Sequence, residues 1–254
     1  MSPEPAPVPP RLETESDAPL SEAARLAGVF FSPGKAFADI ARRPSWWVPV
    51  VIVAILSTIY LNAFTQRVGW ESVIRPTIER LPNSQAMTAQ QREQTITRAA
   101  GFYKYLGYAS PVLTFFWVFI VAVLLMFLFD TLMSAGVGLK RMMAITAYGF
   151  LPLVVQTALS MVVLFLKDPE EFNLQNPLMF NIGAYLSPDA PGALRALGSS
   201  IDLFSIWIIV LLAFGVSAAA RKISFGKAFA GIAIPWMVLI GLKTAAVAAG
   251  MYNP

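Results

Sequence analysis

The sequence contains no cysteine and no histidine, and only 13% of its residues are charged. Without cysteine the chain has no disulfide framework and no thiolate nucleophile. Without histidine it lacks the commonest general base and metal ligand. We therefore predict no catalytic residue, no cofactor-binding residue, no cofactor and no metal ligand, and we expect that the protein is not an enzyme.

Three short patterns that resemble chemical motifs have a plainer structural explanation. The turn at residues 136–138 lacks both the GxxxxGK[ST] pattern of a phosphate-binding loop and its preceding strand. Met142 and Met143 have no Cys or His partner in the chain, so they are expected to fill apolar space. Lys243 has no serine at a matching depth with which to form a serine–lysine pair.

The scarcity of charge goes with an apolar content of 56% and a mean hydropathy of +0.61. These values lie outside the range of ordinary soluble domains. A formal charge of +4 could suggest a nucleic-acid partner, but no block of five or six basic residues occurs. The Lys and Arg residues stand beside apolar runs instead. We expect the lipid bilayer as the partner and no binding of nucleic acid.

The apolar residues are gathered into five runs, each near the roughly 20 residues with which a helix crosses about 30 Å of hydrocarbon. The runs are continuous and lack the alternation of a membrane β-barrel, so helices are predicted. The predicted fold class is all-α: a polytopic membrane helical bundle of about five transmembrane helices, with short amphipathic interfacial helices. The predicted spans are residues 46–67, 106–129, 142–166, 201–219 and 228–249.

The chain before the first span divides into two parts. Residues 1–19 are rich in proline and acidic residues and almost free of apolar ones, so we expect a disordered tail. Residues 20–45 are predicted to form cytoplasmic amphipathic helices. Ser21 can cap the first of them, and Ser32 followed by Pro33 is typical of the start of a second.

The second amphipathic helix is expected to lie in the headgroup layer of the membrane. Phe37 belongs to its apolar face, while basic residues and Asp39 belong to its polar side. Two tryptophans at the start of the first span fit an interfacial aromatic belt. The candidate lipid contacts are Lys35, Phe37, Arg42, Arg43, Trp46 and Trp47. The alternative is that both helices form a cap that packs over the bundle.

Basic residues in the short loops predict the orientation of the bundle. The second-to-third and fourth-to-fifth connections carry Lys140, Arg141, Arg221, Lys222 and Lys227. Both loops and the N-terminus are therefore expected in the cytoplasm, and the acidic residues 167–200 outside. Residues 68–105 carry five basic residues, but this connection is long and contains interleaved glutamates, so we also place it outside. Within it, Thr88 and Gln91 predict a capping box that begins an amphipathic helix.

Two charges belong to predicted spans, where a lone charge near the centre costs several kcal/mol. At 1.5 Å per residue, Lys243 lies about 24 Å along the fifth span, near the face at which Asp202 opens the fourth. One hypothesis is an ion pair between Asp202 and Lys243 that fixes the register of the two helices. The alternative is that Lys243 extends toward water while Asp202 caps its own helix.

Four short motifs follow one another along the chain: Phe31-Ser-Pro-Gly-Lys-Ala-Phe37, Arg43-Pro-Ser-Trp-Trp47, Ala147-Tyr-Gly-Phe-Leu-Pro152 and Ser200-Ile-Asp-Leu-Phe-Ser-Ile-Trp207. In their order and spacing, the chain resembles the prokaryotic branch of the YIP (Ypt-interacting protein) family. The resemblance covers residues 20–249 and implies a five-span domain over residues 46–250, with a cytoplasmic N-terminus in a prokaryotic cytoplasmic (inner) membrane. Eukaryotic members are linked to Rab-type GTPases and vesicle traffic. This sequence lacks their Asp-Leu-Tyr-Gly-Pro signature, so GTPase binding is not expected.

Three classes of function remain open. The resemblance and the missing catalytic residues favour a non-catalytic membrane scaffold or adaptor in membrane organisation or trafficking, with other membrane proteins or a second copy as partners. Proline-interrupted spans and a few polar residues within them leave a small transporter or channel as the alternative. An intramembrane enzyme is the third class, and no residue is assigned to it.

Overall fold

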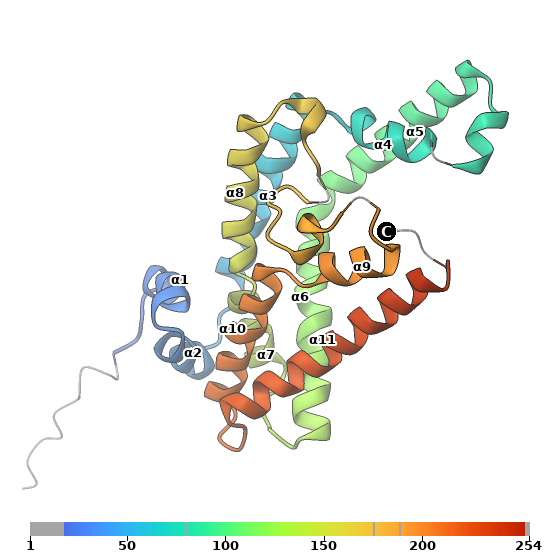
Figure 1. The fold of residues 1–254 in the computed structure, drawn as a ribbon. Coiled ribbons are helices and arrows are strands. Elements are labelled where there is room, and N and C mark those ends of the chain that lie inside the picture. The colour runs from blue at the N-terminus through green and yellow to red at the C-terminus, as the bar shows by residue number, and fades with distance from the viewer. Residues whose placement is uncertain (1–17, 80, 175, 188, 252–254) are drawn as a thin grey trace, which may run out of the picture.

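The computed structural model describes residues 18–79, 81–174, 176–187 and 189–251, and Figure 1 shows its fold. The expected disordered tail therefore lies outside the described residues, apart from its last two positions. The helices are α1 (Glu22–Phe31), α2 (Pro33–Arg42), α3 (Trp47–Arg67), α4 (Trp70–Glu79), α5 (Ala89–Tyr108), α6 (Ser110–Met126), α7 (Leu139–Gly149), α8 (Pro152–Leu166), α9 (Gly192–Ser200), α10 (Leu203–Ala219) and α11 (Phe225–Ala248).

Among the described residues, four helical segments are long and apolar enough to cross a membrane. These are α3, α6 with its π-helical continuation to Leu132, the consecutive pair α7–α8, and α11. The fourth predicted span is α10, an apolar helix of 17 residues, which corresponds to about 25 Å of length. The predicted all-α, polytopic membrane bundle is confirmed, with one span shorter than expected.

The short helix α7 lies at the centre of the bundle. Every residue from Met142 to Pro152 is buried, and α6, α10 and α2 pack around the helix. The predicted third span is not one continuous helix, because α7 ends at Gly149 and α8 begins at Pro152. Proline has no N–H to donate and disfavours helical geometry in the residue before it, so it starts a new helix here.

Two glycines let the central helices approach one another closely. A Cβ atom on Gly215 would lie 2.4 Å from Ile145 Cγ2 and 3.0 Å from Phe37 Cδ1. A Cβ atom on Gly149 would lie 2.6 Å from Leu212 Cδ2. Gly215 therefore marks the point at which α10, α7 and α2 meet, and this crossing has no room for a side chain.

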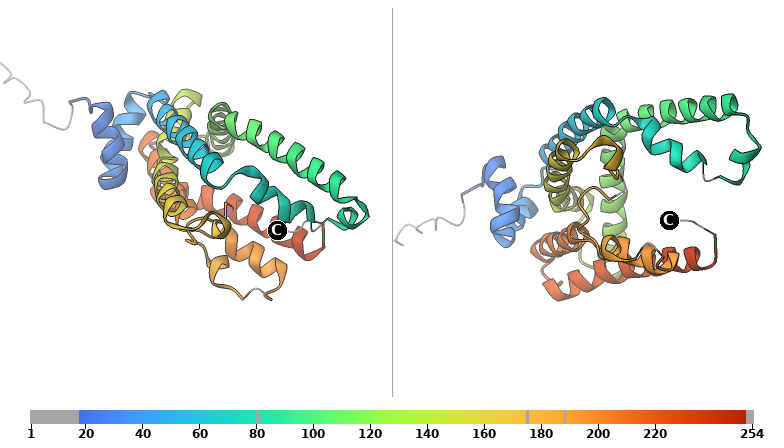
Figure 2. Two further views of the ribbon diagram at one scale, coloured as in Figure 1. Left: turned by 90° about the horizontal axis from the view of Figure 1, so that it is seen from above. Right: turned by 45° about the horizontal axis from the view of Figure 1, so that its top comes forward.

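The amphipathic pair α1–α2 packs against the bundle, beside α7 and α10 (Figures 1 and 2). Val29, Phe37 and Ile40 have no exposed surface and belong to the main hydrophobic core. The structure thus shows the alternative arrangement, in which the apolar faces of both helices are covered by protein. Ser21 caps α1 as expected, whereas Ser32 precedes α2 without a capping hydrogen bond from its side chain.

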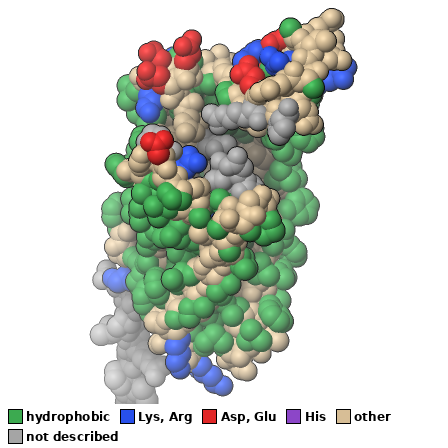
Figure 3. Space-filling model, turned by 45° about the vertical axis from the view of Figure 1, so that its right-hand side comes forward, with side chains coloured by type: hydrophobic (Ala, Val, Ile, Leu, Met, Phe, Trp, Pro, Cys, Tyr) green, Lys and Arg blue, Asp and Glu red, His purple; other side chains and the backbone are tan. Residues whose placement is uncertain are grey.

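The two long connections lie at the same end of the bundle. Arg67 Nε, at the end of α3, donates to the carbonyl of Leu164 at 2.7 Å, and the Phe64 and Phe172 rings pack 6.1 Å apart. Residues 68–105, which carry five basic residues, therefore lie on the same side of the bundle as the acidic connection of residues 167–200. Figure 3 shows a belt of hydrophobic side chains between two ends that carry the charged groups. Which end faces the cytoplasm stays a prediction.

Helices α4 and α5 pack together and project from that end of the bundle (Figure 1). The predicted capping box at the start of α5 is confirmed, because Thr88 and Gln91 exchange side chain-to-backbone hydrogen bonds. Arg75 of α4 forms two hydrogen bonds to the Glu93 carboxylate of α5, at 2.6 and 3.0 Å. The next helix, α6, begins at Ser110 with Pro111 in its first turn, and there the chain enters the bundle.

We expect Gly215→Ala to destabilise the protein by about 1–3 kcal/mol, because the new methyl group has no room beside Ile145. Thermal unfolding of purified protein in detergent measures this loss as a lower midpoint. Gly241→Ala in α11 is the matched control, since nothing lies within 4 Å of its added Cβ atom. Equal midpoints for both variants would contradict the close approach.

Candidate functional site

A buried ion pair joins the two amphipathic helices. Arg25 Nε of α1 donates to Asp39 Oδ2 of α2 at 2.8 Å, and these residues are only 4% and 2% exposed. Arg25 also donates to Glu22 Oε1 at 3.1 Å. The Tyr148 hydroxyl, from the central helix α7, donates to the second carboxylate oxygen of Glu22. We call Glu22, Arg25, Asp39 and Tyr148 the buried network.

The acidic residues of the network favour the charged form of Arg25. Burial by itself disfavours the Arg25 guanidinium, but the hydrogen bond and charge of Asp39, together with the charge of Glu22, raise the pKa of Arg25 above its ordinary value. Removing one partner of a buried pair leaves an uncompensated charge, which costs about 3–5 kcal/mol. The network therefore fixes how α1–α2 sits on α7.

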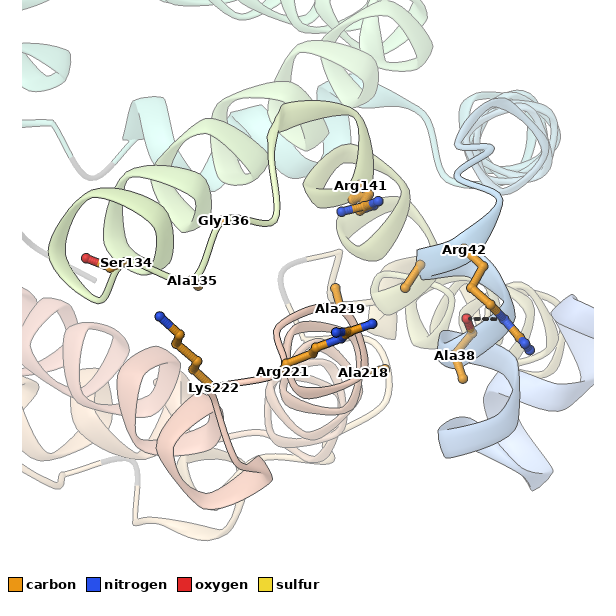
Figure 4. A pocket seen from close by; sticks show the side chains of 11 residues that line it. Ala38, Arg42, Ser134, Ala135, Gly136, Arg141, Ala218, Ala219, Arg221 and Lys222 are labelled. Atoms are coloured by element: carbon orange, nitrogen blue, oxygen red, sulfur yellow. Dashed lines mark hydrogen bonds between the residues drawn. The ribbon is translucent and has the colours of Figure 1, made fainter.

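One turn beyond Asp39 along α2, the end of the bundle contains a hollow of about 560 Å³ (Figure 4). Four basic residues contribute to its wall: Arg42 of α2, Arg141 of α7, and Arg221 and Lys222 from the turn between α10 and α11. The described residues that line it include no acidic side chain. We call these four residues and the space between them the basic hollow. Such a cluster attracts anions.

Small residues and a fixed loop create this space. The remaining lining residues are Ala38, Ala41, Ser134, Ala135, Gly136, Ala218 and Ala219. The loop after α6 is held by Asp130, whose carboxylate oxygens accept from the backbone N–H groups of Val137 at 2.8 Å and Gly138 at 2.7 Å. Gly136 and Gly138 adopt φ values of 68° and 78°, which favour glycine. The hollow is thus built into the fold.

Among the expected lipid contacts, Phe37 is a correction. Its ring is fully buried against α7 and α10, so it cannot touch lipid. Asp39 was expected on the polar side of α2, yet it lies inside because Arg25 neutralises it there. Both residues are buried because α1, α7 and α10 pack against α2.

The other five candidates lie at or near the surface. Lys35, Arg42 and Arg43 are exposed, and the Trp47 side chain is 58% exposed. Trp46 is half-buried, with its ring 5.4 Å from that of Phe115. Contact of these residues with lipid stays a prediction.

The hypothesis of an ion pair between Asp202 and Lys243 is wrong in this structure. Lys243 Nζ donates to Ser200 Oγ at 3.0 Å, so the expectation that no serine lies at a matching depth is also wrong. Asp202 caps α10, accepting from the backbone N–H groups of Phe204 at 2.9 Å and Ser205 at 3.0 Å and from the Ser205 hydroxyl. Among the described residues the two charges form no ion pair. The N–H groups at a helix start satisfy the carboxylate locally.

Sequence reasoning missed the buried network. Its signal was the helical spacing that puts Glu22 and Arg25 on one face of α1 with the buried Val29. A charged residue in register with a core position needs a partner inside the protein, and Asp39 supplies it. Tyr148 stands in the apolar segment Ala147–Pro152, where no neighbouring residue indicates a polar partner. Within the part of the chain that the structure describes, no group of three acidic side chains is placed to hold a metal ion.

We expect Arg25→Met and Asp39→Leu each to lower the stability of the protein by about 3–5 kcal/mol, because each strands one buried charge. The double variant should lose much less than the sum of the two single losses. Thermal unfolding in detergent measures this cycle, and Arg75→Met at the exposed pair with Glu93 is the control, with little change expected. Additive losses would show that the buried pair is not coupled.

Comparison with known proteins places the chain in a family. The Yip1 domain model matches residues 27–245, which include Asp39, Tyr148 and the basic hollow. The membrane protein YknW of Bacillus subtilis (strain 168) is 26% identical over 196 residues, which cover 77% of this chain and 78% of that protein. No solved structure gave a significant match. Because the matched segment spans most of the chain, and because the structure is a helical membrane bundle, this protein belongs to the Yip1 domain family.

Proposed function

We propose that the protein is a non-catalytic membrane scaffold or adaptor. The observation that supports this role best is the buried network, which fastens α1–α2 to the central helix of the bundle. A helix pair held in this way keeps one fixed outer face, whereas a pair that floats in the headgroup layer does not. The bundle anchors the chain in lipid, and α1–α2 presents the surface that a partner would contact.

The turn between α1 and α2 is the centre of the proposed surface. Phe31 is 87% exposed there. Aromatic side chains are enriched at protein–protein interfaces. The proposed partner is another membrane protein or a second copy of this chain.

The polar groups within the spans favour this role over transport. Several hydroxyls each donate to a carbonyl of their own helix, four residues back, at 2.8 Å. These are the hydroxyls of Thr58, Thr114, Thr157 and Ser160. Hydroxyls satisfied inside their own helices offer little to a polar path through the bundle. Transport or channel activity remains the outcome that would replace the proposal.

We expect a photo-crosslinking residue at position 31 to form adducts with discrete proteins, or with a second copy, in native membranes. Tyr105 is the matched control, since it is 77% exposed but lies on α5, toward the other end of the bundle. Mass spectrometry identifies the adducts. Adducts with lipid alone at position 31, together with solute or ion flux in liposomes of the pure protein, would overturn the scaffold role.

The proposed location is a prokaryotic cytoplasmic membrane, with α1–α2 and the basic hollow facing the cytoplasm. Support comes from the basic side chains of the hollow, because short cytoplasmic connections are enriched in Lys and Arg. The acidic connection after α8 lies at the opposite end.

We expect single cysteines at Asn83 and Asp189 to react with an impermeant thiol reagent in intact cells, because both belong to the end proposed to lie outside. A cysteine at Lys140 should react only after lysis. The native chain contains no cysteine, so each label reports one position. The reverse pattern at any of the three positions would contradict this orientation.

A further inference from the structure

The basic hollow has a chemistry that neither the fold nor the scaffold role uses. Four basic residues from three separate parts of the chain line about 560 Å³ of space. We propose that this hollow binds the phosphate of an anionic phospholipid headgroup, taken from the leaflet at that end of the bundle. The proposal is independent of the adaptor role, because it rests on the hollow alone.

Three of the basic side chains of the hollow are not neutralised within the part of the chain that the structure describes. Arg141, Arg221 and Lys222 have no salt-bridge partner among the described residues. The nearby Asp130 carboxylate is already used by two backbone N–H groups of the loop after α6. An anion between these cations would therefore meet a concentrated positive field.

The side chains are arranged around one space. In Figure 4, Arg141 and Arg221 stand on either side of the gap between the loop after α6 and helix α2, and Lys222 extends toward Ser134 and Ala135. Arg42 belongs to the wall formed by α2, but its guanidinium points away from Arg141 and Arg221 in Figure 4, and its Nε donates to the Ala38 carbonyl at 3.3 Å. Guanidinium groups can bind phosphate oxygens in a bidentate manner. A volume of this size is typical of small-ligand sites.

The neighbouring surface favours a lipid over a soluble phosphate compound. Leu132, two residues before the lining Ser134, is 63% exposed, and Phe225, three residues after Lys222, is 40% exposed. Both residues belong to helical segments long and apolar enough to span a membrane. A ligand in the hollow would thus have cations at its polar group and apolar side chains beside it. A phospholipid has both parts.

Native mass spectrometry of the purified full-length protein in detergent, titrated with phosphatidic acid, tests the proposal. We expect Arg141→Gln with Arg221→Gln to weaken binding by about fivefold for each charge removed. Lys140→Gln with Lys227→Gln is the matched control, because it removes the same charge at the same end from exposed residues outside the hollow. The control should bind as the unchanged protein does.

Ala219→Leu provides a second test that leaves the charge unchanged. It places a larger side chain in the wall of the hollow and should also weaken the binding of phosphatidic acid. Equal weakening in the hollow and control variants would overturn the proposal, since binding would then follow surface charge alone. Binding of inorganic phosphate without preference for phosphatidic acid would identify a soluble anion site instead. Unfolding midpoints of all variants show whether each has folded.

Discussion

The ion pair between Arg25 and Asp39 is the interaction on which the arrangement of the two amphipathic helices depends. Both side chains lie where a membrane-surface helix would carry apolar groups, so each can be buried only with the other present. Once paired, they bring α1 and α2 together on the central helix, where Tyr148 reaches Glu22. Phe37 then fills the space that Gly215 leaves open. Charge pairing thus determines where the apolar packing forms.

Helix α2 also connects this core with the basic hollow. Asp39 and Arg42 are three residues apart, so their side chains lie on neighbouring turns of one helix face. The ion pair fixes the rotation of α2, and that rotation brings Arg42 to the wall of the hollow. A substitution in the buried network is therefore expected to move Arg42 in the wall of the basic hollow.

The sequence allowed prediction of the features that local chemistry decides. Continuous apolar runs revealed the spans, and the capping pattern at Thr88 and Gln91 revealed the start of α5, because both depend on neighbouring residues only. The burial of Phe37 depends on contacts between α2 and helices more than a hundred residues away, so periodicity could not distinguish a lipid partner from a protein partner. For Asp202 the sequence allowed either an ion pair with Lys243 or a cap on its own helix. The nearest backbone N–H groups bind the carboxylate, so it caps the helix.

The length of α10 connects the fold with the proposed lipid site. Its 17 residues give a helix of about 25 Å, some 5 Å less than the hydrocarbon core of a typical bilayer. Such a helix can be tolerated because it is central, with much of its surface covered by α2, α7 and α11. The turn that follows it is then drawn toward the bundle, and this turn carries Arg221 and Lys222. In the proposed lipid site, these cations would meet the phosphate of an anionic headgroup at the end of this short helix.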